Sequence, residues 1–301
     1  FTASFVRIFL NATTIDGYNP YRISRSGVDW EVPEPENPRA NIGYWSDHQI
    51  GYLARLLELL REQDPEQLRA LGADTAYVHV DVPYRLASYA DLVRDPHNTV
   101  TFEEERHDQA MARVAEIGGD GRLLRDADGA LVRAGLGEKL LILLTAKLVN
   151  FVPDGGIWMN TQRPEWNDAN NALVGRGLSV VTVAYLHRYV ELVQELLRGQ
   201  SVEMSVPLAR AVEAITAILD GPGVAAQSRD AALPLDSGGR RELLDALGEV
   251  GGSYRDAVRS QPTERVQLDG AALAAHLEVV ARWLARTVRR NRRPDGLYHA
   301  Y

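Results

Sequence analysis

The sequence predicts a mostly helical, all-α protein, in which the helices form two layers around one core. Two stretches, 138–151 and 178–197, are apolar on nearly every side, which is typical of helices that are buried all round. Several other stretches carry apolar residues on one helical face only, so they predict amphipathic helices packed around those two. A double-layered helical barrel satisfies both observations, because its inner helices have neighbours on every side.

The amphipathic helices are expected along most of the chain. Apolar residues recur at helical spacing in 1–10, 50–60, 66–71, 84–93, 102–117, 207–219, 240–258 and 271–288. Prolines and glycines predict a long irregular segment over 11–38 and an exposed linker over 221–239. His187 lies inside the second apolar helix, where we expect a core histidine rather than a catalyst.

Short strands are expected in only two places. Valines alternate with other residues in 76–82, which is typical of a short strand. Asp120-Gly121 and Asp128-Gly129 predict turns of a small β-hairpin within 118–135. The second of these turns resembles the start of a calcium loop, but it lacks the terminal glutamate, so we expect a turn.

Composition limits the range of functions. The formal net charge is −8, which does not favour nucleic acid, and the chain has no cysteine for disulfides or thiolate chemistry. No apolar run has the length of about eighteen residues that a membrane span needs. We therefore expect a cytoplasmic protein without membrane contacts. Both termini look cut, so we expect 1–301 to be one catalytic-type domain of a longer chain, which contacts its other domains.

The segment 160–171, between the two apolar helices, is unusually rich in functional groups. From Gln162 to Asn171 it carries two carboxylates, one guanidinium, four side-chain amides and one indole. Carboxylates and amides match the hydroxyls of a sugar, and a tryptophan covers its apolar face. Burial beside an indole also keeps a carboxylic acid protonated, so that it can act as a general acid. A metal site would favour histidine, and we expect neither a metal nor an organic cofactor.

This segment contains Glu165-Trp166-Asn167-Asp168-Ala169-Asn170-Asn171, which resembles the Asp-Trp-Asn-Asp-Gly-Met-Asn motif of the cellobiose and chitobiose phosphorylase family. The resemblance implies an (α/α)6 barrel, in which the motif lies mid-barrel. It also implies that Asp168 is the general acid and that Trp166 and Asn167 line the sugar site. From the polar composition of the segment we further expect Arg163, Glu165, Asn170 and Asn171 to bind substrate. The chain departs from the family pattern at Glu165 and at Ala169-Asn170.

Two other segments combine aromatic side chains with polar ones. The first includes Arg22, Asp29, Trp30 and Glu31, which either form the rim of a sugar cleft or belong to a surface segment that covers the core. The second, 44–49, contains Tyr44, Trp45 and Asp47. Asp47 either binds the sugar or serves as the N-cap of the helix that follows. We expect the segments 16–31, 44–49 and 160–171 to surround one cleft.

These observations predict an enzyme that breaks or forms a glycosidic bond with inversion. The leading hypothesis is phosphorolysis of a β-linked glucoside, with inorganic phosphate as co-substrate and Asp168 as the acid. An inverting hydrolase is an alternative, with Asp47 or Glu31 as the base that activates water. The other alternative is a non-catalytic glycan-binding domain, which would use Trp45, Trp158 and Trp166.

Overall fold

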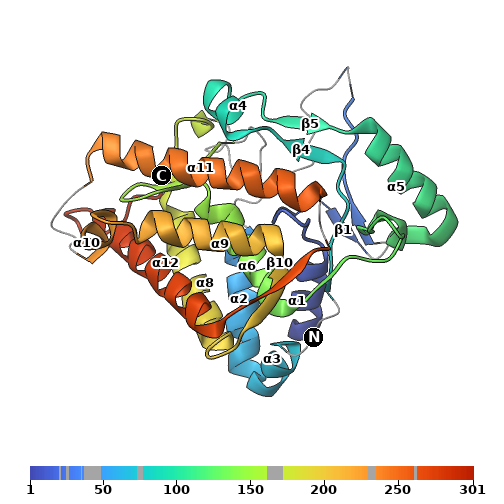
Figure 1. Cartoon of the computed structure of the whole chain (residues 1–301), viewed down its shortest axis with the longest axis horizontal. Coiled ribbons are helices and arrows are strands. Elements are labelled where there is room, and N and C mark those ends of the chain that lie inside the picture. The colour runs from blue at the N-terminus through green and yellow to red at the C-terminus, as the bar shows by residue number, and fades with distance from the viewer. Residues whose placement is uncertain are drawn as a thin grey trace.

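A computed structural model describes residues 1–19, 22–24, 27–34, 36, 49–72, 77–160, 172–229, 235–260 and 263–301 of the chain. These residues contain eleven α-helices and several two- or three-stranded sheets, so the predicted helical class is confirmed (Figure 1). They do not confirm a helical barrel.

Most of the predicted helices are present, with bounds that differ by a few residues. The helices are α1 (Thr2–Asn11), α2 (Gln49–Gln63), α3 (Pro65–Gly72), α4 (Tyr89–Arg94), α5 (Glu104–Ile117), α6 (Leu136–Leu148), α8 (Val180–Leu196), α9 (Val206–Leu219), α10 (Val224–Arg229), α11 (Ser237–Ser260) and α12 (Gly270–Arg290). A 3₁₀ helix, η1, spans Gly118–Arg122.

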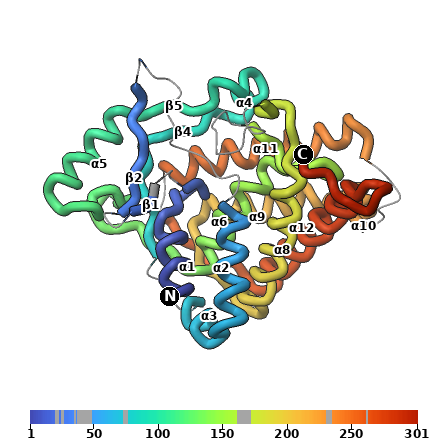
Figure 2. Tube along the Cα trace, turned by 180° about the vertical axis from the view of Figure 1, so that it is seen from behind, coloured from blue at the N-terminus to red at the C-terminus, as the bar shows by residue number. Residues whose placement is uncertain are grey.

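Helix α6 forms the centre of the fold. All thirteen of its residues are buried, as its apolar sequence predicts. Around it, α1 packs on α2, α2 on α8, α8 on α12, α12 on α9, and α9 on α11. The two views agree: α9 and α11 lie in front of α6 in Figure 1, and α1 and α2 lie in front of it in Figure 2. The middle of the molecule is therefore occupied by a helix.

Residues 12–19 close this ring between α11 and α1. The Tyr254 hydroxyl on α11 donates a hydrogen bond to the Ile15 carbonyl, with an O···O distance of 2.8 Å. Gly17 has φ +91°, and a Cβ there would lie 2.7 Å from Cβ of Ala146 on α6. Only glycine combines this left-handed backbone with so close an approach to a helix.

The charged side chains that α6 buries have partners from distant segments. Arg265 donates hydrogen bonds of 2.8 and 2.6 Å to the two carboxylate oxygens of Glu138. Lys139 Nζ donates to the Val78 carbonyl at 2.8 Å and lies 3.0 Å from Nδ1 of His79. Burial holds the pKa of both Lys139 and His79 well below their ordinary values, and the lysine charge lowers the pKa of His79 further.

The strands are short and more numerous than the sequence predicts. They are β1 (Arg22–Ser24), β2 (Gly27–Asp29), β3 (Tyr77–Val78), β4 (Tyr84–Leu86), β5 (Val100–Phe102), β6 (Arg133–Ala134), β7 (Phe151–Val152), β8 (Gly156–Trp158), β9 (Leu178–Ser179), β10 (Val202–Ser205) and β11 (Arg265–Leu268). Adjacent strands are antiparallel in the pairs β1–β2, β3–β6, β4–β5, β7–β8, β8–β9 and β10–β11.

The two predicted β regions are confirmed in reduced form. In the first, β3 pairs with β6, and Val80 forms an isolated bridge with Leu123. In the second, Arg125 and Leu131 form the bridge of a small hairpin. The prediction that strands occur only in these regions is wrong. The strand pairs elsewhere join two to four residues, which is too few for an alternating pattern to be visible in the sequence.

Three further predictions need correction. The helix expected over 84–93 begins with β4 instead, which pairs with β5, and only its second half forms α4. The expected linker 221–239 contains the short helix α10. The His187 side chain is 27% exposed and lies 4.0 Å from Glu191, so it is not a fully buried core histidine.

A second layer covers one side of α11. It consists of α4, β4, β5 and α5, which lie along the upper edge of the molecule in Figure 1. Arg85 on β4 pairs with Asp256 at 2.8 Å, and the Tyr89 hydroxyl donates a 2.5 Å hydrogen bond to Asp245.

Within the part of the chain that the structure describes, every helix is too short or too polar to span a bilayer.

Because α6 is buried, a substitution that creates a cavity along it should greatly lower the free energy of unfolding. Leu144 is 0% exposed. Leu144→Ala should lower the free energy of unfolding by about 2–5 kcal/mol, because it removes buried apolar surface and leaves a cavity. Leu297→Ala is the matched control, since Leu297 is 61% exposed; its change should stay within about 0.5 kcal/mol. Urea unfolding measures both, and equal effects would contradict the central position of α6.

Candidate functional site

Most of the side chains predicted to bind or cleave a sugar cannot be placed. The candidates that lie outside the described residues are Tyr44, Trp45, Asp47, Arg163, Glu165, Trp166, Asn167, Asp168, Asn170 and Asn171. Arg22 belongs to β1, where its backbone pairs with Asp29. The site is therefore built here from the residues that flank these segments.

The segment 161–171 starts and ends beside the three-stranded sheet β7–β8–β9. Trp158 on β8 pairs with Leu178 on β9. Asn160, which is 7% exposed, donates a 2.6 Å hydrogen bond from Nδ2 to Oδ1 of Asn150, and Asn150 in turn donates to the Ala146 carbonyl at the end of α6. Two buried amides thus tie Asn160, the residue before the segment 161–171, to the end of the central helix.

We call the described residues that flank the segment 161–171, namely Asn150, Trp158, Asn160 and Gly175, the stem. Trp158 packs within this stem and does not form an open platform for a sugar ring. It is only 9% exposed, and its indole Nε1 donates to the Gly175 carbonyl at 3.2 Å, which joins the two sides of the segment. The Tyr89 ring meets it edge-on, with ring centroids 6.2 Å apart. If the chain binds a glycan through an exposed tryptophan, that residue is therefore not Trp158.

The segments 44–49 and 161–171 precede helix ends that lie on the same side of the molecule, because α2 and α8 run parallel. Near their starts, a Cβ at Gly51 would lie 3.3 Å from the Tyr185 ring. Near their ends, Arg61 and Glu195 form an ion pair at 3.0 Å. Gln49 and Val180, the first residues of these helices, consequently lie at one common end.

An ion-pair cluster fixes this parallel register at mid-helix. Arg188 on α8 donates hydrogen bonds of 3.0 and 2.7 Å to Glu58 Oε1 on α2, and Arg55 adds a second guanidinium. Partial burial acts to raise the pKa of Glu58, but the hydrogen bonds and charges of the two arginines outweigh it, so the pKa lies below its ordinary value.

The segment 16–31 reaches the same stem through buried aromatic side chains. Tyr18 and Trp30 belong to one contiguous apolar cluster with Tyr84, Tyr89 and Trp158. The indole Nε1 of Trp30 donates to Nδ1 of His107 at 3.1 Å, and the Arg122 guanidinium lies 5.6 Å from the Trp30 ring centroid. The reserve base Glu31 is half-buried, and its backbone carbonyl accepts a 2.6 Å hydrogen bond from the Tyr84 hydroxyl.

Asn19 is a buried polar side chain whose hydrogen-bonding capacity is unused. The residue is 2% exposed, and neither Oδ1 nor Nδ2 has a hydrogen-bond partner in the structure. Its neighbour Asp16 is held by the Thr14 hydroxyl at 2.6 Å and by Arg259 at 3.5 Å. Leaving a buried amide without partners costs free energy, so such groups are exceptions that point to a water or ligand nearby.

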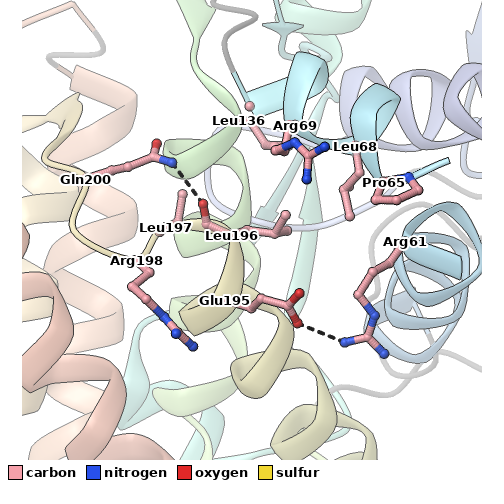
Figure 3. Close-up of a pocket in the computed structure, with 11 residues that line it drawn as sticks. Arg61, Pro65, Leu68, Arg69, Leu136, Glu195, Leu196, Leu197, Arg198 and Gln200 are labelled. Carbon is pink, nitrogen blue, oxygen red and sulfur yellow. Dashed lines mark hydrogen bonds and ion pairs between the residues drawn. The ribbon is translucent and has the colours of Figure 1, made fainter.

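Two cavities have arginine-rich walls. The first, here called the stem cavity, has a volume of about 370 Å³ and is lined by Tyr89, Trp158, Arg176, Arg240 and Arg241, among others. The second, the far cavity, has a volume of about 460 Å³ and includes Arg61, Arg69, Glu195 and Arg198 (Figure 3). Sequence analysis predicted neither cavity, because the arginines of each come from separate segments and carry no motif.

Of these two cavities, the stem cavity is the one lined by described residues that flank the segment 161–171. Trp158 precedes that segment and Arg176 follows it, whereas the far cavity lies at the C-terminal ends of α2 and α8, away from the common end. The described residues contain no group of three or more histidine or acidic side chains that could hold a metal ion.

No protein-family model matches the chain, and no curated protein sequence shows significant similarity to it.

The stem makes a testable contribution to stability. Asn150→Ala removes the acceptor of the Asn160 amide inside the protein, and should lower the free energy of unfolding by about 1–3 kcal/mol. Asn98→Ala is the control, because Asn98 is exposed and its side chain makes no hydrogen bond in the structure. Thermal and urea unfolding measure both variants. If Asn150→Ala is as stable as Asn98→Ala, the two amides do not anchor the segment.

Proposed function

We propose that the chain is a carbohydrate-active enzyme domain that breaks or forms a glycosidic bond with inversion. The observation that carries this proposal is that described residues flanking the polar segments lie at one end of the helices. The described flanks of 44–49 and 161–171 lie at that end, and the aromatic residues of 16–31 pack in one cluster with Trp158. The unpartnered amide of Asn19, next to Tyr18, supports a ligand rich in hydroxyl groups.

In the proposed mechanism, Asp168 is the general acid. It donates a proton to the departing glycosidic oxygen while a nucleophile attacks the anomeric carbon from the opposite face of the sugar. This role rests on the resemblance of the segment 165–171 to the phosphorylase motif. A carboxyl group in a desolvated position beside an indole would have a raised pKa and would be protonated near neutral pH.

Phosphorolysis is the leading form of this reaction. Inorganic phosphate serves as the nucleophile there, so no second catalytic carboxylate is needed, whereas an inverting hydrolase needs a base that activates water. Glu203, Glu213 and Glu242 are exposed in the structure, which disfavours each of them as that base. Under this proposal the substrate is a β-linked glucoside.

The (α/α)6 architecture is part of the same proposal. It rests on the resemblance of 165–171 to the phosphorylase motif and on the mostly helical structure, whereas the central position of α6 does not support it. In a barrel of this kind, connections between the helices line one cleft.

An assay with and without phosphate distinguishes the candidate functions. The protein is incubated with β-linked disaccharides, and the products are separated and identified. Release of sugar 1-phosphate only in the presence of phosphate supports phosphorolysis. Free sugar in both conditions would indicate a hydrolase, and retained binding without turnover would indicate a glycan-binding domain.

The role of Asp168 predicts a selective loss of activity. Asp168→Asn keeps the shape of the side chain but removes the proton donor, so turnover of an unactivated disaccharide should fall by a factor of about 10²–10⁴ while substrate affinity changes little. A substrate whose leaving group needs no protonation should recover much of this loss. Steady-state kinetics on both substrates measure the effect.

Glu165→Gln is the matched control, since it neutralises the other carboxylate beside Trp166. Near-normal turnover by Asp168→Asn on the unactivated disaccharide, together with an inactive Glu165→Gln, would instead identify Glu165 as the acid.

A further inference from the structure

The arginines of the two cavities differ in their structural explanation. In the far cavity, Arg61 and Arg69 lie in the last turns of α2 and α3, and Arg198 follows the end of α8. Cations are favourable at helix C-termini, where they offset the negative end of the helix dipole. The same cavity also contains Glu195, which pairs with Arg61. Helix stabilisation therefore accounts for the arginines of the far cavity.

The arginines of the stem cavity are not explained by helix stabilisation. Arg240 lies in the first turn of α11, where the helix dipole disfavours a cation, and within the described residues its side chain makes one hydrogen bond, a 3.4 Å contact with the Asp236 carbonyl. The Arg176 side chain is exposed and makes no ion pair or hydrogen bond in that part of the chain. Two guanidinium groups thus face one cavity without carboxylate partners.

The third arginine is already neutralised. Arg241 donates a 2.6 Å hydrogen bond from Nε to Asp245, which also accepts from the Tyr89 hydroxyl. This chain of contacts orients the tyrosine ring against Trp158. Among the described residues that line the stem cavity there is no aspartate or glutamate, so within this set Arg176 and Arg240 are an excess of positive charge.

We propose that the stem cavity binds the carboxylate of an acidic saccharide. This inference rests on the proposed function and narrows its substrate to sugars that carry a carboxyl group. The guanidinium group presents a planar fork of donors that matches a carboxylate. Val93, Leu178 and Leu244 add apolar surface to the wall of the cavity. A volume of about 370 Å³ lies in the range of small-molecule sites and exceeds the size of a free inorganic anion.

The position of the cavity links it to the predicted reaction centre. Trp158 lies two residues before Asn160, and Arg176 follows the segment 161–171 on its other side. The residues that line the cavity therefore flank, on both sides in the sequence, the segment that carries Asp168.

The test compares one acidic and one neutral disaccharide. Calorimetric titration measures the affinity of the protein for cellobiouronic acid, a β-linked disaccharide of glucuronic acid and glucose, and for cellobiose, at constant ionic strength. The wild-type protein should bind the acidic sugar at least about tenfold more tightly, as expected from charge-assisted hydrogen bonds. The double variant Arg176→Gln/Arg240→Gln should lose this preference and keep its affinity for cellobiose. The matched control Arg69→Gln/Arg198→Gln removes two arginines from the far cavity and should change neither affinity.

The other outcomes overturn the inference in distinguishable ways. Equal affinity of the wild-type protein for the two sugars would exclude the carboxylate subsite and leave the proposed function standing. Failure to bind either sugar would overturn both. If inorganic phosphate displaces the acidic sugar and the Arg176→Gln/Arg240→Gln variant loses phosphate affinity, the arginines hold free phosphate, and the inference is wrong.

Discussion

The structure depends on the burial of one helix on every side. A helix without a solvent-exposed face needs apolar neighbours all round, and any charge it carries needs a partner inside the protein. α6 meets both conditions, through the ring of helices and through Glu138 and Lys139. Arg265 and the Val78 carbonyl, which bind these two side chains, come from segments far apart in the sequence. Satisfying the central helix thus brings β3 and β11 against it.

The same constraint organises the candidate site. The chain leaves the buried end of α6 through Asn150 and the β7–β8 turn, and it returns through β9 into α8. Because α8 runs parallel to α2, the first residues of both helices lie at the same end. Residues 12–19, pressed against α6 at Gly17, bring Tyr18 into one apolar cluster with Trp158. Packing around one helix therefore explains why these described flanks of the polar segments come together.

The sequence predicts the helices well because their periodicity extends over several turns, as in α9, α11 and α12. It fails where the pattern is too short to read: the helical spacing over 84–93 hides β4, and nothing in the sequence predicts β7–β9. The site is predicted from side-chain chemistry and from a motif resemblance, and its principal residue, Asp168, lies outside the described residues. The stem cavity was not predictable, because Arg176 and Arg240 become neighbours only when α11 packs beside the sheet.

We propose that 16–31, 44–49 and 160–171 together build one cleft at the common end of the helices. Hydrogen–deuterium exchange, with and without a saturating β-linked disaccharide, tests it most directly, because it reports every segment in one experiment. Slower exchange is predicted in peptides from all three segments, and no change in peptides covering 61–72 and 195–200 at the far cavity. Protection confined to one of the three segments, or protection at the far cavity instead, would contradict the account.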